Sequence, residues 1–288
     1  MAAAGEIENM AVFCDFENVA LGVQDAKYEK FDIKVVLEKL LVKGSIVVKK
    51  AYCDWARYKE FKAPMHEAAF ELIEIPHVRQ SGKNSADIRM VVDALDLCYT
   101  KAHVDTFVIV SGDSDFSPLV SKLRENNKTV IGVGVKASTS DLLIKNCDEF
   151  IFYDDLVRAT ETRRRSAAKK SEQRKAEPKS AERRKSEKHG ESGNEAADEA
   201  LAGRRQTAIN LVLETVEELI EARGSDERIF ASMVKQALKR RRPEFNESYH
   251  GYKGFAALLD DAAARGLLTV TRDDKTGQHL VRLPAGNR

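Results

Sequence analysis

Several features that would assign a chain to a class at once are scarce in this sequence of 288 residues. It has 4 cysteines, which lie tens of residues apart and form no C-x-x-C pair. They are Cys14, Cys53, Cys98 and Cys147. Zinc ligands and the cysteines of disulfide-rich domains usually come in closer spacings. We therefore expect four buried free thiols and neither a zinc site nor a disulfide framework.

Long hydrophobic runs are also missing. The longest, such as residues 106–110, are far shorter than the roughly 20 residues that cross a bilayer. The first nine residues carry two glutamates and no basic residue, unlike a secretory signal. These absences predict a cytoplasmic protein with no membrane partner.

The net charge of +1 conceals a strongly uneven distribution. Residues 158–188 hold 13 Lys and Arg against 5 Asp and Glu, with almost no aliphatic or aromatic residue. Such a stretch cannot bury enough apolar surface to fold alone, and it attracts polyanions. We read residues 158–202 as a charged linker, either a solvated helix or disordered.

Before this linker, apolar strand-like runs alternate with helical patterns, which is typical of βαβ units and a parallel sheet. The predicted strands are residues 10–14, 45–52, 75–79, 106–111, 129–135 and 149–153. The predicted helices are residues 32–42, 63–74, 86–99, 117–126 and 140–146. The fold class is therefore α/β, an open three-layer sandwich.

Aspartates lie where such a sheet carries its chemistry. Asp15 ends the first predicted strand, and Asp113 and Asp115 follow the fourth. Open α/β sheets bind ligands at the carboxyl ends of strands, so a first strand beside the fourth would bring these carboxylates together. Asp87 opens the helix after the third predicted strand and could reach the same place.

Several carboxylates in one pocket repel each other unless a cation compensates them. Oxygen ligands suit hard divalent ions, so the sequence predicts a Mg²⁺ or Mn²⁺ site. Each aspartate alone could instead be a helix cap or a turn residue. Asn18 and Ser111 are close enough in sequence to support the carboxylates.

Two basic residues lie close to Asp87 in the sequence. Lys83 and Arg89 would suit phosphate contacts, although ordinary surface exposure explains them equally well. Asp93 lies six residues after Asp87, about 240° around a helix, and so faces elsewhere.

Three segments carry a family resemblance: FCDFEN at residues 13–18, KNSAD at residues 83–87 and SGDSDFSPL at residues 111–119. Together they resemble the NYN domain, the LabA-like branch of the PIN-type nucleases, over residues 8–157. One departure is Ser85-Ala86, where Gly-Val often precedes the aspartate. The resemblance implies a PIN-like, Mg²⁺- or Mn²⁺-dependent, endoribonuclease-like hydrolase. It assigns Asp15, Asp87, Asp113 and Asp115 to the acidic site.

Residues 203–285 predict a second, smaller domain with helices at residues 207–223, 226–241 and 252–265. Two strands, residues 267–272 and 279–283, flank a turn, as in the wing of a winged helix. With the segment GYKGFAALL at residues 251–259, this order resembles the OST-HTH, or LOTUS, domain, which implies RNA binding. The basic candidates for nucleic-acid contact are Lys235, Lys239, Arg240, Arg241, Arg242 and Lys253.

The sequence thus favours a metal-dependent ribonuclease with a C-terminal RNA-binding domain. Asn18 would align a water or a phosphate oxygen, and Ser111 would support the metal ligands. The alternative is a catalytically inactive RNA-binding or regulatory protein whose acidic pocket holds metal. A receiver-like phosphotransfer domain fits less well, because no phosphorylatable aspartate with acidic neighbours stands out. A homodimer and a protein partner for the C-terminal domain stay open.

Overall fold

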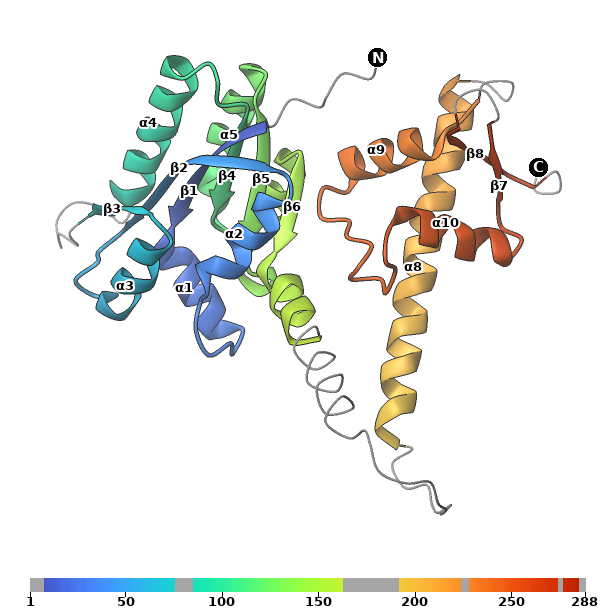
Figure 1. Ribbon diagram of the computed structural model, residues 1–288, viewed down its shortest axis with the longest axis horizontal. Helices are drawn as coiled ribbons and strands as arrows, with labels where there is room; N and C mark the ends of the chain where they lie inside the picture. Colours follow the sequence, from blue (N-terminus) through green and yellow to red (C-terminus); the bar gives the residue numbers. More distant parts are fainter. Residues whose placement is uncertain (1–7, 76–84, 163–191, 224–227, 274–276, 285–288) are drawn as a thin grey trace, which may run out of the picture. The chain divides into compact units, whose positions relative to one another are not determined.

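The computed structural model describes all residues except 1–7, 76–84, 163–191, 224–227, 274–276 and 285–288 (Figure 1). The chain divides into two compact units, Met1–Gln173 and Arg174–Arg288. Each unit has its own hydrophobic core.

A six-stranded sheet forms the centre of the first unit, and all of its strand pairs are parallel. The order across the sheet is β3-β2-β1-β4-β5-β6. The strands are β1 (Glu8–Asp15), β2 (Gly44–Cys53), β3 (Glu71–Glu74), β4 (Thr106–Val110), β5 (Thr129–Gly134) and β6 (Glu149–Phe152). The order reverses direction at β1, so the neighbours β1 and β4 form the switch point that the sequence predicts.

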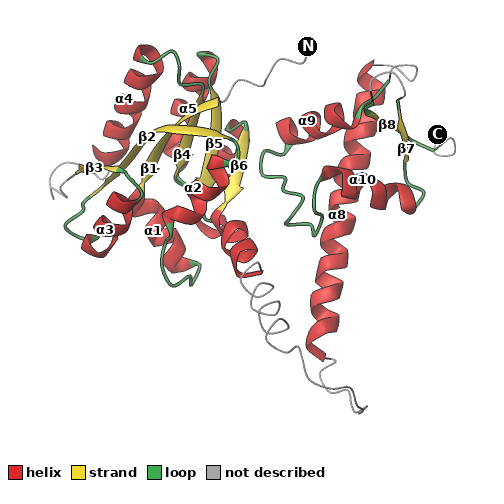
Figure 2. Ribbon diagram, viewed as in Figure 1, coloured by secondary structure: helices red, strands yellow, loops and turns green. Residues whose placement is uncertain are grey.

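Helices cover both faces of this sheet (Figure 2). They are α1 (Phe16–Asp25), α2 (Ile33–Leu41), α3 (Lys59–Glu67), α4 (Ser85–Thr100), α5 (Ser117–Glu125) and α6 (Asp141–Asn146). Two short 3-10 helices, η1 (Ser114–Phe116) and η2 (Lys136–Ser138), lie in the connections after β4 and β5. Residues 153–162 form a further helix after β6.

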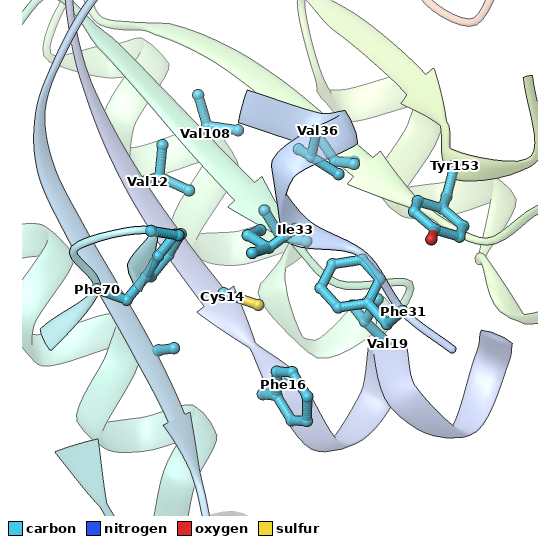
Figure 3. Packing of buried hydrophobic residues seen from close by; sticks show 14 of the residues in the cluster. Val12, Cys14, Phe16, Val19, Phe31, Ile33, Val36, Phe70, Val108 and Tyr153 are labelled. Atoms are coloured by element: carbon cyan, nitrogen blue, oxygen red, sulfur yellow. The ribbon is translucent and has the colours of Figure 1, made fainter. Parts of the chain in front are cut away.

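The two faces have separate cores because side chains of β1 alternate between them. Val12 and Cys14 pack with α1, α2 and α3 on one face, as Figure 3 shows. Ala11 and Phe13 pack with α4, α5 and α6 on the other. β1 is buried on both sides, which explains its uninterrupted apolar sequence.

Two sequence predictions for this unit are wrong. The third strand is Glu71–Glu74, not residues 75–79, of which residues 76–79 lie outside the described part. The preceding helix, α3, ends at Glu67 instead of continuing to residue 74. β3 is an edge strand that pairs only with β2, so its polar residues face solvent and its composition resembles that of a helix.

Helix α1 was not predicted at all. It begins directly after β1, where the Asp15 side chain caps it, and it buries Phe16, Val19 and Val23 at helical spacing. Gly22 weakens the helical signal, because glycine is unfavourable inside helices. The helix packs closely against η2 here, since a Cβ on Gly22 would lie 2.3 Å from the Ser138 Oγ.

The second unit contains three helices and a two-stranded sheet. The helices are α8 (Ser192–Arg223), α9 (Ala231–Arg241) and α10 (Phe255–Ala264), and β7 (Thr269–Arg272) pairs antiparallel with β8 (His279–Arg282). α8 begins within the stretch predicted as linker. Residues 228–230 are not helical, because Phe230 forms a bridge with Leu280 of β8. The predicted start of the second helix at residue 226 is therefore too early.

Two further expectations concern the whole described chain. No helix in it is long and apolar enough to cross a membrane. All four cysteines are free and buried, as expected.

Candidate functional site

The carboxyl ends of β1 and β4 bring together two acidic segments that are almost 100 residues apart. Cys14 and Val110 are partners in the parallel register, so Asp15 and Ser111 follow side by side. The Ser111 hydroxyl donates to Asp15 Oδ2 at 3.0 Å. It also accepts from the backbone N–H of Asp113 at 3.2 Å. One buried serine therefore connects both acidic segments.

Asn18 makes a second connection between the same segments. It lies in the first turn of α1, and its backbone N–H donates to Asp15 Oδ1 at 3.5 Å. Its side-chain Oδ1 accepts from the Gly112 N–H at 2.9 Å. This geometry makes Asn18 a positioning residue for the loop after β4.

Asp113 and Asp115 occupy that loop. The Asp113 side chain caps η1 by accepting from the Asp115 N–H at 2.9 Å. Asp113 is half-buried and Asp115 is exposed. Both roles of Asp113 weighed from the sequence, helix cap and member of an acidic group, are therefore combined in one residue.

Asp87 lies in the first turn of α4 and is half-buried. Burial, together with the charges of Asp113, Asp115 and Glu17, raises its pKa to about 6. The sequence prediction that Asp87 approaches the other acids is thus supported by electrostatics.

Asp15 carries the largest electrostatic cost in this group. It is 7% exposed. Burial, then the charge of Asp87, raises its pKa to about 7, against the hydrogen bonds from Ser111 and Asn18. Asp113 adds a smaller repulsion. The four aspartates therefore form one electrostatically coupled group.

The chemistry of this group fits a hard divalent cation, because every donor is a carboxylate oxygen. A cation would also relieve the repulsion that raises the pKa values of Asp15 and Asp87. Within the described residues, however, no three acidic, histidine or cysteine side chains are arranged closely enough to hold a metal ion. The group thus fits a metal by donor type and charge, with side chains that would have to close around it.

Sequence reasoning missed two neighbours of this group. Glu17, two residues after Asp15, contributes to the raised pKa of Asp87 and binds Arg57 at 2.9 Å. Arg57 follows β2, which lies beside β1 in the sheet. Glu17 could have been found from its place within the FCDFEN segment. No sequence pattern places Arg57 near the acidic group, because its position depends on the strand order.

Of the two basic residues predicted beside Asp87, only Arg89 lies within the described residues, and it is not brought into the acidic group. Lys83 lies outside the described residues. Arg89 is two residues after Asp87, about 200° around α4, and its Nε contacts Asp93 Oδ1 at 3.0 Å. Asp93 also accepts from the Tyr52 hydroxyl at 2.9 Å. Asp93 thus has a structural role on another side of the helix.

In the second unit, most of the predicted nucleic-acid contacts lie on or directly after α9, Lys253 precedes α10, and their surroundings differ. Lys235 pairs with Glu247 at 2.9 Å, and Arg241 pairs with Glu214 and Glu218. Lys239 is half-buried. The exposed members are Arg240, Arg241, Arg242 and Lys253.

Two aromatic side chains near these residues belong to the core. Tyr252 is 7% exposed and donates to Asp261 at 2.6 Å. Phe255 is 8% exposed. Neither presents an open ring for base stacking. Tyr249 is half-buried, and Arg204 lies over its ring.

Two known proteins are similar to part of this chain. The uncharacterised protein MJ0482 of Methanocaldococcus jannaschii is 30% identical over 127 residues, 41% of this chain and 49% of that protein. The chain thus spans about half the length of this curated relative. The crystal structure of VPA0982, a protein of unknown function from Vibrio parahaemolyticus, is 28% identical with a TM-score of 0.48. It covers 53% of this chain and 97% of that chain.

The match to a family is more specific. Residues 9–154 match the NYN domain, and this range spans the sheet and all four aspartates. It agrees with the predicted range of residues 8–157. The chain therefore belongs to the NYN domain family, whose members are typically nucleases and generally bind RNA.

Proposed function

We propose that this protein is a metal-dependent ribonuclease that hydrolyses RNA phosphodiester bonds. The observation that carries the proposal is the buried Asp15, whose pKa is raised to about 7 by burial and by Asp87. Folding places this carboxyl beside other acids at a cost, and structural hydrogen bonds only partly offset that cost. A bound cation would offset the repulsion between these carboxylates, so the arrangement favours a cation-binding site.

The proposed site uses Asp15, Asp87, Asp113 and Asp115 as ligands for Mg²⁺ or Mn²⁺. Such an ion would lower the pKa of a water molecule and neutralise charge that develops on the phosphate. Ser111 holds Asp15 and the Asp113 backbone in register, and Asn18 fixes the loop through Gly112. The acids would thus orient the reacting groups without attacking the phosphate themselves.

For the second unit we propose an RNA-binding winged helix of the OST-HTH, or LOTUS, type. Its support is the order of α8, α9 and α10 before the β7–β8 hairpin. The backbone N–H of Val281 also donates to the carbonyl of Ile229 at 2.8 Å, so the segment before α9 joins the hairpin edge. Arg240, Arg242 and Lys253 would contact phosphates.

The domain boundaries that accompany this proposal are residues 8–157 for the nuclease domain and 203–285 for the winged helix. Residues 158–202 are the proposed charged linker. RNA is the proposed partner of both domains. The positive charge of the linker sequence would add affinity that does not depend on RNA sequence.

The experiment that tests the nuclease proposal measures cleavage of end-labelled single-stranded RNA by the full chain with Mg²⁺ or Mn²⁺. Asp113→Asn keeps the oxygen that caps η1 but removes the charge, so we expect at least a hundredfold loss of rate. EDTA should abolish cleavage. Asp96→Asn changes an exposed carboxylate on α4 outside the acidic group and serves as the matched control.

The outcomes separate the two functions considered from the sequence. Cleavage lost with EDTA and in Asp113→Asn, but kept in Asp96→Asn, supports the nuclease. RNA binding without cleavage by the intact chain would favour the inactive RNA-binding or regulatory protein. Equal cleavage by the intact chain and Asp113→Asn would refute the assigned site.

A further inference from the structure

Helix α4 carries a row of apolar side chains on its solvent-facing side. Ile88, Val92 and Tyr99 are 62%, 56% and 65% exposed, and Leu95 between them is half-buried. Their spacing of four, three and four residues is that of a coiled-coil seam, and it confines them to about 60° of the helix circumference. The residues of α4 that are fully buried lie on a different side of the helix. We call these four residues the α4 seam.

A seam of this kind is unusual on a surface helix that has no partner. Single apolar side chains are common on protein surfaces, whereas a continuous row along a helix is typical of helix pairing. The Tyr99 hydroxyl accepts a hydrogen bond at 3.3 Å from Nδ2 of Asn126, the residue after α5. This bond fixes the exposed ring, so the ring is already oriented before any partner binds.

The charges beside the seam match those of a second copy of the same helix. Arg89 and Asp96 are both exposed and lie on the same flank of the seam, one heptad apart. In an antiparallel helix pair the same flanks of the two helices meet, so Arg89 of each copy lies beside Asp96 of the other. A parallel pair would instead bring this flank against the opposite one, which holds the half-buried Val91 and the buried Cys98. Charge complementarity therefore favours the antiparallel pair.

The apolar contacts fit the same register. A two-fold axis between residues 93 and 94 places Ile88 against Tyr99 of the other copy and Val92 against Leu95 of the other copy. With this axis, Arg89 and Asp96 of the other copy lie about 3 Å apart along the helix direction. One axis thus satisfies both the apolar seam and the charged flank.

We propose that this protein forms a homodimer through antiparallel packing of α4 against α4 of a second copy. The inference goes beyond the nuclease proposal and does not depend on it. Each copy keeps its own acidic group accessible, since Asp87 lies about 110° around the helix from the seam. A pair of helices of 16 residues is about 24 Å long, so the interface belongs to the small class below about 1,200 Å². We therefore expect a reversible dimer that dissociates in the micromolar range.

The first test measures the mass of the full chain, without RNA, by sedimentation equilibrium from about 1 µM to about 500 µM. The average mass should rise from 32.2 kDa toward twice that value. Val92→Glu places a charge at the centre of the seam and should weaken dimerisation at least tenfold. Val42→Glu is the matched control, because Val42 is an exposed valine at the end of α2, outside the seam. Circular dichroism should show that both variants stay folded, since both valines are exposed.

Exchange of charges tests the partner and the orientation together. Arg89→Asp sets an aspartate against Asp96 in both charged contacts of the dimer, and Asp96→Arg sets an arginine against Arg89. Each variant alone should dimerise about fivefold more weakly than the intact chain. A mixture of the two variants forms a mixed dimer in which both contacts again join opposite charges. Its affinity, measured by sedimentation of labelled Arg89→Asp with unlabelled Asp96→Arg, should return to that of the intact chain.

The results either support the α4 dimer or overturn it. Weaker dimerisation in Val92→Glu but not in Val42→Glu, with recovery in the mixture of charge variants, supports it. A chain that stays monomeric over the whole range overturns it, because something other than a second copy then covers the seam. A dimer that Val92→Glu leaves unchanged uses another surface, and a mixture no tighter than the single variants contradicts the antiparallel register. None of these outcomes affects the nuclease proposal, which the cleavage assay tests separately.

Discussion

Asp15 belongs to the proposed metal site and also lowers the free energy of unfolding of the metal-free protein. Its carboxyl is almost completely buried, and its pKa of about 7 exceeds the ordinary value of 3.8. Below about pH 4 the carboxyl is protonated in both the folded and the unfolded chain. As the pH rises from 4 to 7, only the unfolded chain ionises, so the free energy of unfolding falls. Above pH 7 the full penalty is present.

Asp15→Asn should therefore stabilise the metal-free protein while abolishing cleavage. We expect the free energy of unfolding to rise by roughly 1–3 kcal/mol at pH 8, less than the pKa shift alone implies because charged hydrogen bonds are lost. The gain should shrink toward zero near pH 4. Urea unfolding in EDTA at several pH values measures it.

Asp93→Asn provides a control of opposite sign. Asp93 accepts from Tyr52 and pairs with Arg89 and Lys50, so its loss should destabilise the protein. A destabilised Asp15→Asn at pH 8 would contradict the account of Asp15 as an uncompensated charge.

At the scale of elements, the short helix η2 packs against the loop after β4. A Cβ on Gly112 would lie 2.4 Å from the Ser138 backbone carbonyl oxygen. The Ser140 N–H donates to the Gly112 carbonyl at 2.9 Å. The loop that carries Asp113 thus depends on a glycine and on the segment after β5.

Gly112→Ala should consequently lower both stability and activity. The backbone of η2 would have to move, which costs about 1–3 kcal/mol of the free energy of unfolding. Thermal unfolding and the cleavage rate measure the two effects. Gly203→Ala is the matched control: nothing lies within 4 Å of its added Cβ, and an alanine inside helix α8 should stabilise by roughly 0.5–1 kcal/mol. Equal behaviour of the two variants would contradict the close packing at Gly112.

Elements also show what sequence could and could not predict. β1, β2, β4, β5 and β6 were placed within a few residues, because buried parallel strands are continuously apolar. β3 was misplaced, since an edge strand with one solvent face lacks that signal. α1 was missed, because Gly22 weakens the helical pattern at a place where the helix packs closely against Ser138.

The candidate site, too, could be predicted only in part. The sequence made the convergence of the acids conditional on β1 lying beside β4, and the sheet order meets that condition. Ser111 and Asn18 were predicted to support the acids, but the hydrogen bonds by which they connect the two segments could not be, because those atoms meet only in the fold.

At the scale of the whole molecule, one aromatic residue allows the first unit to be observed separately. Trp55 is the single tryptophan of the chain, is 1% exposed, and donates to the Ile73 carbonyl at 3.1 Å. Its fluorescence therefore reports unfolding of the unit that contains the acidic group. Far-ultraviolet circular dichroism reports both units, because both contain helices.

Mg²⁺ at millimolar concentration should raise the unfolding midpoint seen by Trp55 fluorescence, because a ligand of the folded state stabilises it. The shift should be larger at pH 8 than at pH 5.5, where protons compete for the acidic group. It should disappear in Asp15→Asn. The part of the circular dichroism transition that comes from the second unit should keep its midpoint. An equal shift in Asp15→Asn would place the cation elsewhere.

The wide sequence separation of the acidic segments has a consequence for synthesis in the cell. A growing chain that has released only β1, β2 and β3 holds Asp15 without its partners, because β4 and the Asp113 loop come later. The proposed site is therefore incomplete in a nascent chain until β4 inserts beside β1, so the proposed activity requires a folded domain.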